Sequence, residues 1–404
     1  MPILLYAYLT AEILGPFFAS LLIINAILFL GKLSSLLDII FSFGIGFADF
    51  SRISIYLLPS LLLFSIPMAS TLGVIIAFTR MTGDNEILAL KAAGIGIYRL
   101  LIPVVIVALF TTGLTALAST MLIPKSSVAL KQTFYQLARE KIEQGVQAKE
   151  FSDSIKDVVV YVDRIDKQTG QWQGVFISDQ RDRQTPLTII AQSGSLDADL
   201  DKMTVNLVLR DGTIHRNGSD VSQTIRFGGY NLQLPLTPGA PMQEGHKKEL
   251  SPAELLAWAA ELKTTAGSAK DPRRKSHLLG VSISLIIEFH KRFALPVGCL
   301  ILTILALPLA LQSKPGRSKA GLPLGLFFFF IYYIMLSFAK SIAETSGMVI
   351  GPVMWGPNLI FGILTLLIIR TAARENSVKI FDKLTDHISA FISLAKEATG
   401  KLKR

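Results

Sequence analysis

The chain has 404 residues, of which 50% are hydrophobic and 17% are charged, and its formal net charge is +10 at pH 7. Soluble domains carry about 25% charged residues, so this composition is typical of a membrane protein. The single cysteine, Cys299, excludes an intrachain disulfide and a metal cluster held by cysteines.

Six uncharged stretches are each long enough to cross a bilayer as a helix. A hydrocarbon core about 30 Å thick needs about 20 helical residues, and only helices or closed barrels satisfy their backbone polar groups there. We therefore predict three spans, a polar segment and three further spans. The six stretches are Ile13–Gly31, Ile53–Thr79, Leu100–Pro124, Phe293–Ser313, Ala320–Ala339 and Thr345–Ile369.

The predicted fold class is a membrane protein of six transmembrane helices with an inserted all-β, jellyroll-like domain outside the membrane. Residues 1–124 hold spans one to three, with a short cytoplasmic helix near residues 83–94. Residues 125–150 are expected to be a helix that leaves the membrane. The remaining segments are the β domain at 151–236, a return linker and helix at 237–291, spans four to six at 292–370, and a basic amphipathic tail at 371–404.

The β prediction is based on short β-branched or alternating runs that are separated by turn signals. Such runs favour an open sandwich or jelly roll, with turns at Asp211-Gly212, Asn217-Gly218 and Gly228-Gly229. We expect an apolar interior, either a packed core or a groove for acyl chains. Residues expected to line it are Val160, Phe176, Ile190, Leu207 and Phe227.

Beyond the β region, Ser251, Pro252 and Glu254 predict the start of a helix, because they supply a cap, a first-turn proline and a capping-box glutamate. The tail places apolar residues at helical spacing among lysines. It could lie on the membrane surface or cover a partner.

Lysine and arginine in the short loops predict the orientation. The loop after span two holds Arg80, Lys91 and Arg99, the loop after span four holds three basic residues, and the stretch from Arg370 to Arg404 holds eight. The other side is poorer in basic residues. Both termini are therefore expected in the cytoplasm, with the β domain on the outer side of the membrane.

The sequence contains no recognisable catalytic constellation. It lacks the G-x-x-x-x-G-K-[ST] nucleotide loop, the H-E-x-x-H zinc motif and the G-x-S-x-G elbow. No two of its five histidines have metal-ligand spacing, and the span interiors hold no ionisable side chain of the Asp, Glu, Lys, Arg or His type. We expect no catalytic residue, metal or cofactor, and any energy input must come from another subunit.

Two sets of residues are candidates for function. The first lies in the loop after span two, where a capped short helix could transmit force, or could simply connect two spans; its members are Arg80, Asp84, Asn85, Glu86, Leu88, Ala92 and Gly94. The second is a set of cations expected at the outer interface, where they could bind lipid phosphates or merely snorkel from helix ends; they are Lys32, Arg52, Lys291, Arg292 and Lys340.

The order of several motifs resembles the LptF/LptG (YjgP/YjgQ) permeases of the lipopolysaccharide exporter. The motifs are Thr79-Arg80 … Asn85-Glu86-Ile87 … Ala92-Ala93-Gly94, Glu288-x-His290-Lys291-Arg292-x-Ala294-Leu295-Pro296, Leu305-Ala306-Leu307-Pro308-Leu309 and Trp355-Gly356-Pro357-Asn358. Val175-Phe176-Ile177-Ser178-Asp179 and Ile189-Ile190-Ala191-Gln192-Ser193-Gly194 are more similar to the LptF branch.

The resemblance implies a non-catalytic subunit that extracts lipopolysaccharide from the outer leaflet of the inner membrane. The implied partners are an LptG-like permease in a heterodimer, an LptB-like ATPase dimer that binds the ATP, and LptC-like and LptA-like bridge proteins. The helix with Glu86 would contact the ATPase, and lipid would enter between the first span of one permease and the fifth of the other. No nucleic acid partner is expected. The alternatives are a membrane-anchored scaffold whose β domain binds a periplasmic partner, and a lipid transferase.

Overall fold

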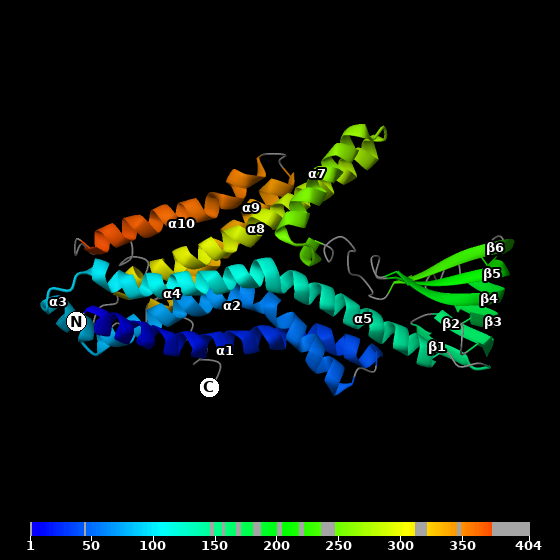
Figure 1. The fold of residues 1–404 in the computed structure, drawn as a ribbon, viewed down its shortest axis with the longest axis horizontal. Coiled ribbons are helices and arrows are strands. Elements are labelled where there is room, and N and C mark those ends of the chain that lie inside the picture. Colours follow the sequence, from blue (N-terminus) through cyan, green and yellow to red (C-terminus); the bar gives the residue numbers. More distant parts are fainter. Residues whose placement is uncertain are drawn as a thin grey trace, which may run out of the picture. The chain divides into compact units, whose positions relative to one another are not determined.

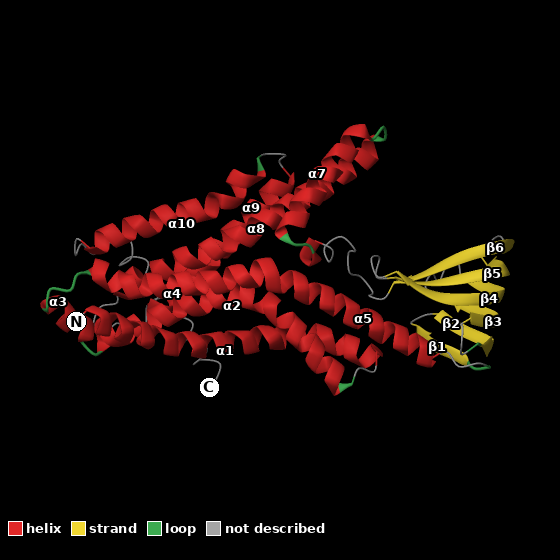
Figure 2. Cartoon of the chain, viewed as in Figure 1, coloured by secondary structure: helices red, strands yellow, loops and turns green. Residues whose placement is uncertain are grey.

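The computed structural model describes residues 2–43, 46–145, 149–155, 158–166, 171–180, 187–199, 204–217, 222–235, 247–311, 321–345 and 349–373 (Figures 1 and 2). The predicted basic loop after span four and the basic tail lie outside these residues. The helices are α1 (Pro2–Phe43), α2 (Phe47–Gly83), α3 (Glu86–Ala92), α4 (Ile97–Leu117), the π-helical turn η1 (Ala118–Leu122), α5 (Ile123–Gly145), α7 (Pro252–Ser268), α8 (Pro272–Leu311), α9 (Gly321–Thr345) and α10 (Ile350–Ala373). The strands are β1 (Phe151–Ile155), β2 (Val158–Ile165), β3 (Gln171–Asp179), β4 (Leu187–Asp199), β5 (Thr204–Asn217) and β6 (Ser222–Pro235).

The prediction of six spans and an inserted β domain is confirmed. Among the described residues, six helical segments are long and apolar enough to cross a bilayer. They are Ile3–Ser34, Phe47–Gly83, Ile97–Leu137, Pro272–Leu311, Leu322–Thr345 and Ile350–Ala373. The helix of the fourth span begins at Pro272, well before the uncharged stretch that predicted it, so its first turns are polar.

The chain divides into two compact units. The helical unit comprises residues 1–34, 57–125 and 247–404, and the second unit comprises residues 35–56 and 126–246. In the helical unit α8 packs against α4, α7, α9 and α10. One apolar cluster of the helical unit joins α1, α2, α3 and α4 to the end of α8. Another cluster joins α8, α9 and α10.

Buried polar side chains link the helices of this unit. The hydroxyl of Tyr332 in α9 donates to Asn358 Oδ1 of α10 at 2.8 Å, and Asn358 Nδ2 donates to the carbonyl of Ala294 in α8 at 3.0 Å. The hydroxyls of Ser70 in α2 and Thr303 in α8 lie 2.7 Å apart. Polar groups inside a bilayer need such partners, because lipid tails offer none.

The six described strands form one antiparallel sheet in the order β1-β2-β3-β4-β5-β6. Each strand therefore pairs with its neighbour in the sequence, as in a meander, within the β domain that was predicted as an open sandwich or jelly roll. Two of the predicted turns are wrong, because β5 runs through Asp211-Gly212 and β6 runs through Gly228-Gly229. The third turn signal, Asn217-Gly218, stands where β5 ends.

Close packing explains why a turn signal occurs inside β5. Asp211 has a positive φ of 52°, which is tolerated by aspartate more readily than by most residues. A Cβ on Gly212 would overlap the Ile190 carbonyl of β4 and the ring of Phe227 in β6. Glycine is therefore required because two strands approach closely, and it marks no reversal of the chain.

Candidate functional site

The connector between α2 and α4 contains α3, a helix of seven residues. Its C-terminal end has the hydrogen bonds of a Schellman motif: Gly94 N–H donates to the Lys91 carbonyl at 2.9 Å, and Ile95 N–H donates to the Leu90 carbonyl at 3.0 Å. Gly94 has a φ of 82°, which favours glycine. Gly94 thus ends the helix as the sequence predicted.

The N-terminal end of α3 differs from the expected cap. Asn85 occupies the cap position with a φ of 60°, but its side chain makes no capping hydrogen bond. Instead, the Glu86 carboxylate accepts a hydrogen bond of 2.9 Å from the Tyr8 hydroxyl of α1. Near this contact Arg80, in the last turn of α2, forms an ion pair with Glu12 of α1.

These contacts fix α3 on one side and leave it open on the other. Ile87 is buried in the cluster that joins α1, α2, α4 and α8, so the connector packs onto the helices. Leu88 is 66% exposed, and Asp84 and Ala92 are exposed as well. Leu88, Asp84 and Ala92 thus lie on the free side of the connector. Sequence reasoning missed Tyr8 and Glu12, because only the fold brings α1 to the connector.

The five predicted lipid-phosphate cations have different surroundings. Lys32 is exposed near the end of the α1 span, and Lys340 lies 3.7 Å from Glu344 one turn further along α9. In the second unit, exposed Arg52 lies 3.6 Å from Asp49. Lys291 is partly exposed and bonds to Glu288 at 3.3 Å. These four side chains reach the surface, which phosphate binding requires.

Arg292 is different, because its side chain is only 3% exposed. Its guanidinium donates to three backbone carbonyls, those of Leu250 at 2.6 Å, Lys247 at 3.0 Å and Lys248 at 3.4 Å. It also lies 3.8 Å from Glu288 Oε1. In this structure Arg292 serves as an internal support and is not presented to a lipid phosphate.

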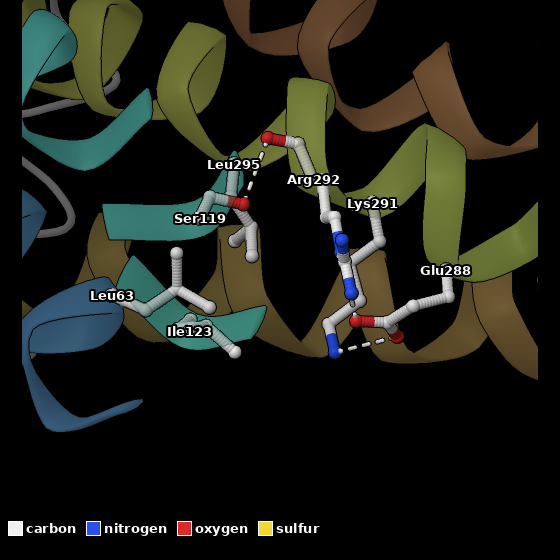
Figure 3. Close-up of a pocket in the computed structure, with 7 residues that line it drawn as sticks. All are labelled: Leu63, Ser119, Ile123, Glu288, Lys291, Arg292 and Leu295. Carbon is white, nitrogen blue, oxygen red and sulfur yellow. Dashed lines mark hydrogen bonds and ion pairs between the residues drawn. The ribbon is translucent and has the colours of Figure 1, made fainter. Parts of the chain in front are cut away.

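Figure 3 shows the small pocket beside this arginine. The Ser119 hydroxyl points at the backbone carbonyl of Arg292, and the guanidinium extends along Glu288 on the other side. Among the described residues, Arg292 Nε is a buried nitrogen without a hydrogen-bond partner. The lining residues are Leu63, Ser119, Ile123, Glu288, Lys291, Arg292 and Leu295.

The predicted acyl-chain residues do not share one face of the sheet, which corrects the expectation of a single lining. Val160 pairs with Ile177 and is buried with it, and Leu207 is fully buried in the same cluster. Phe227 packs against that cluster. Phe176 pairs with Ile190, which is 48% exposed, on the opposite side. The cause is the strand period of two, which turns neighbouring residues to opposite faces.

The structure is that of a polytopic membrane protein: its described residues include six span-length helices and an inserted antiparallel sheet. A family model described as "Lipopolysaccharide export system permease LptF/LptG" matches residues 7–371. The chain therefore belongs to the LptF/LptG family, and it is a multi-pass inner-membrane permease subunit of the lipopolysaccharide export system. The match does not separate the LptF branch from the LptG branch.

The chain is also similar to "Uncharacterized protein RP871" of Rickettsia prowazekii (strain Madrid E). The two are 25% identical over 312 residues, which cover 74% of this chain and 82% of that protein.

Proposed function

We propose that this chain is the LptF-type subunit of an ATP-driven exporter that takes lipopolysaccharide from the outer leaflet of the inner membrane. It pairs with an LptG-like permease, and an LptB-like ATPase dimer drives both. LptC-like and LptA-like proteins receive the lipid from the β domain. The chain itself binds no cofactor, and the ATPase binds the ATP.

The observation that carries this proposal is the supported connector. Helix α3 lies between two spans, ends in a Schellman motif and is tied to α1 through Tyr8 and Glu86. Such a helix can pass movement of an attached ATPase to α1, α2 and α4 together. Exposed Leu88 and neighbouring Asp84 supply the free surface for that contact.

The orientation follows from the distribution of basic residues. Arg80 and Arg99 flank α3 and Lys91 lies in its last turn, so we infer from the positive-inside rule that this connector is cytoplasmic, as are both termini. The β domain, which follows the third span, is then periplasmic. A Leu88→Cys variant should react with a membrane-impermeant thiol reagent only in inside-out vesicles, and reaction in right-side-out vesicles would contradict this orientation.

The deciding experiment is reconstitution in proteoliposomes with the partner permease, the ATPase and the LptC-like protein. We expect lipopolysaccharide to pass to the LptA-like acceptor only when ATP is hydrolysed, and Glu86→Ala to lower this transfer at least about tenfold. Glu261→Ala, a matched change in α7, should leave it unchanged. A chain that assembles with its partners but transfers no lipid would favour the scaffold reading.

A further inference from the structure

Arg292 makes two sets of contacts through two different parts of the residue. Its guanidinium bonds to the carbonyls of Lys247, Lys248 and Leu250, which lie just before α7. Its own carbonyl accepts a hydrogen bond of 3.0 Å from the Ser119 hydroxyl in η1. One residue of α8 thus holds two segments that are far apart in the sequence.

Pro296 explains why the carbonyl of Arg292 is available. In an α-helix that carbonyl would accept the N–H of the residue four positions later, and that residue is Pro296, which has no N–H. Ser119 supplies the missing donor from outside the helix. A buried carbonyl without a donor would be costly, so the contact specifies where η1 lies against α8.

The Ser119 side of the contact is also specialised. Ser119 belongs to a five-residue π-helical turn between α4 and α5. The turn precedes Pro124, whose ring disfavours a regular α-helix at this point. π-helical turns inside helices occur often at functional positions. Two helix irregularities therefore lie at this contact: the π-helical turn that contains Ser119, and Pro296 in α8.

The two segments that Arg292 holds lie at the two ends of residues 126–246. η1 leads directly into α5, along which the chain leaves the helical unit for residues 126–246 of the second unit. Residues 247–250 begin the return to the helical unit. We propose that Arg292 is a positioning residue that holds to α8 the two points where residues 126–246 leave and rejoin the helical unit, so that a shift of α8 is passed to both points at once.

Arginine is suited to this task where lysine is not. Its planar fork directs several N–H groups at fixed angles and stays charged when buried. Glu288, at 3.8 Å, balances the charge. A lysine at this position would keep the charge but would present a single ammonium group to three carbonyls.

This inference rests on the proposed export function, and the first experiment separates the two. In the reconstituted complex we would measure lipopolysaccharide transferred per ATP hydrolysed for wild type, Arg292→Gln and Arg274→Gln. Arg274 is an exposed arginine on the same helix and serves as the matched control. We expect Arg292→Gln to assemble and to hydrolyse ATP, with the ratio lowered about tenfold, the order for losing a charge-assisted hydrogen bond. Arg274→Gln should match wild type.

If the wild-type complex transfers no lipid, the export function itself is wrong. If wild type transfers lipid and Arg292→Gln has the same ratio, only the role of Arg292 is wrong. Should Arg292→Gln fail to assemble, Ser119→Ala replaces it, because this change removes one hydroxyl and leaves the guanidinium in place. We expect the ratio for Ser119→Ala to fall several-fold, and a wild-type ratio would overturn the proposal.

A covalent tether tests the positioning role directly. Lys247 Nζ donates to Ser284 Oγ of α8 at 3.1 Å, so cysteines at these two positions can be joined by a short thiol-reactive crosslinker. Buried Cys299 would be replaced by serine in all variants. We expect the crosslink to restore the ratio in Arg292→Gln, because it rebuilds the attachment without the charge. An unrestored ratio would mean that Arg292 acts through its charge.

Discussion

The hydroxyl of Tyr8 donates a hydrogen bond of 2.9 Å to Oε2 of Glu86, and this bond joins α1 to α3 across 78 positions of sequence. The proposed function assigns α3, which begins at Glu86, to coupling the permease to its ATPase. The bond predicts that Tyr8 contributes to that coupling by orienting the carboxylate.

Tyr8→Phe should therefore lower ATP-driven lipid transfer by about two- to tenfold, which is less than Glu86→Ala, since the carboxylate is kept. The double variant should equal Glu86→Ala alone, because the two side chains act through one contact. Transfer assays on the purified complex measure both. Tyr98→Phe, an exposed tyrosine in α4, is the control. Additive effects would show that Tyr8 acts elsewhere.

The second prediction concerns exposed Lys32 of α1 and half-exposed Lys340 of α9. Lysine binds phosphate as a point charge, so Lys32→Glu should reduce the lipopolysaccharide that co-purifies with the assembled complex several-fold. Lys340→Glu should do the same and should also repel Glu344, which lies 3.7 Å away in the native chain. If both flank one gate, their effects should be non-additive. If both variants co-purify with wild-type amounts of lipid, normalised to assembled complex, the two lysines do not bind lipid phosphates and only extend to the membrane interface.

The third prediction uses the two faces of the sheet. If acyl chains enter the inner face, a photocrosslinking phenylalanine analogue at Phe227 should capture lipopolysaccharide, because this ring is half-buried at the margin of the inner cluster. The same probe at Ile190, on the opposite face, should not. The gain of about 0.8 kcal/mol per buried CH₂ group makes the inner face the favourable path. Capture at Ile190 alone would reverse this assignment.

Sequence patterns correctly predicted the elements that depend on residues close together in the sequence. Uncharged length was enough for the spans, and Ser251, Pro252 and Glu254 form the predicted capping box at the start of α7. The errors came from contacts between distant residues. Position 212 requires a glycine because Phe227 and Ile190 leave no room for a Cβ. In the sequence this glycine resembles a turn signal. Arg292 is charged and lies near a span, so the sequence suggested that it binds a lipid phosphate. In the structure its guanidinium instead donates to carbonyls of residues that are distant in the sequence.

The fourth prediction tests packing between α8 and α9. A Cβ on Gly298 would overlap the ring and hydroxyl of Tyr332, which is held by its bond to Asn358. Gly298→Ala should therefore destabilise the chain by about 1–3 kcal/mol. Gly113→Ala in α4 is the matched control, since a Cβ there meets nothing within 4 Å, and it should be neutral or slightly stabilising. Thermal denaturation in detergent compares them, and equal melting temperatures would contradict the close contact.

The last prediction concerns the pH dependence of α7. The pKa of Glu254 is lowered because its carboxylate accepts a hydrogen bond from the Ser251 backbone N–H at 2.7 Å, with a further contribution from the Ser251 side chain. A carboxyl whose pKa is lowered on folding stabilises the folded state above the pKa of the unfolded chain, and this contribution is lost as the pH falls through the folded pKa. The first turn of α7 should thus lose protection as the pH falls below the ordinary glutamate pKa of 4.5. Amide hydrogen exchange, corrected for intrinsic rates, measures this change, and Glu254→Gln should abolish it. Equal pH dependence in wild type and Glu254→Gln would show that the capping box does not control the end of α7.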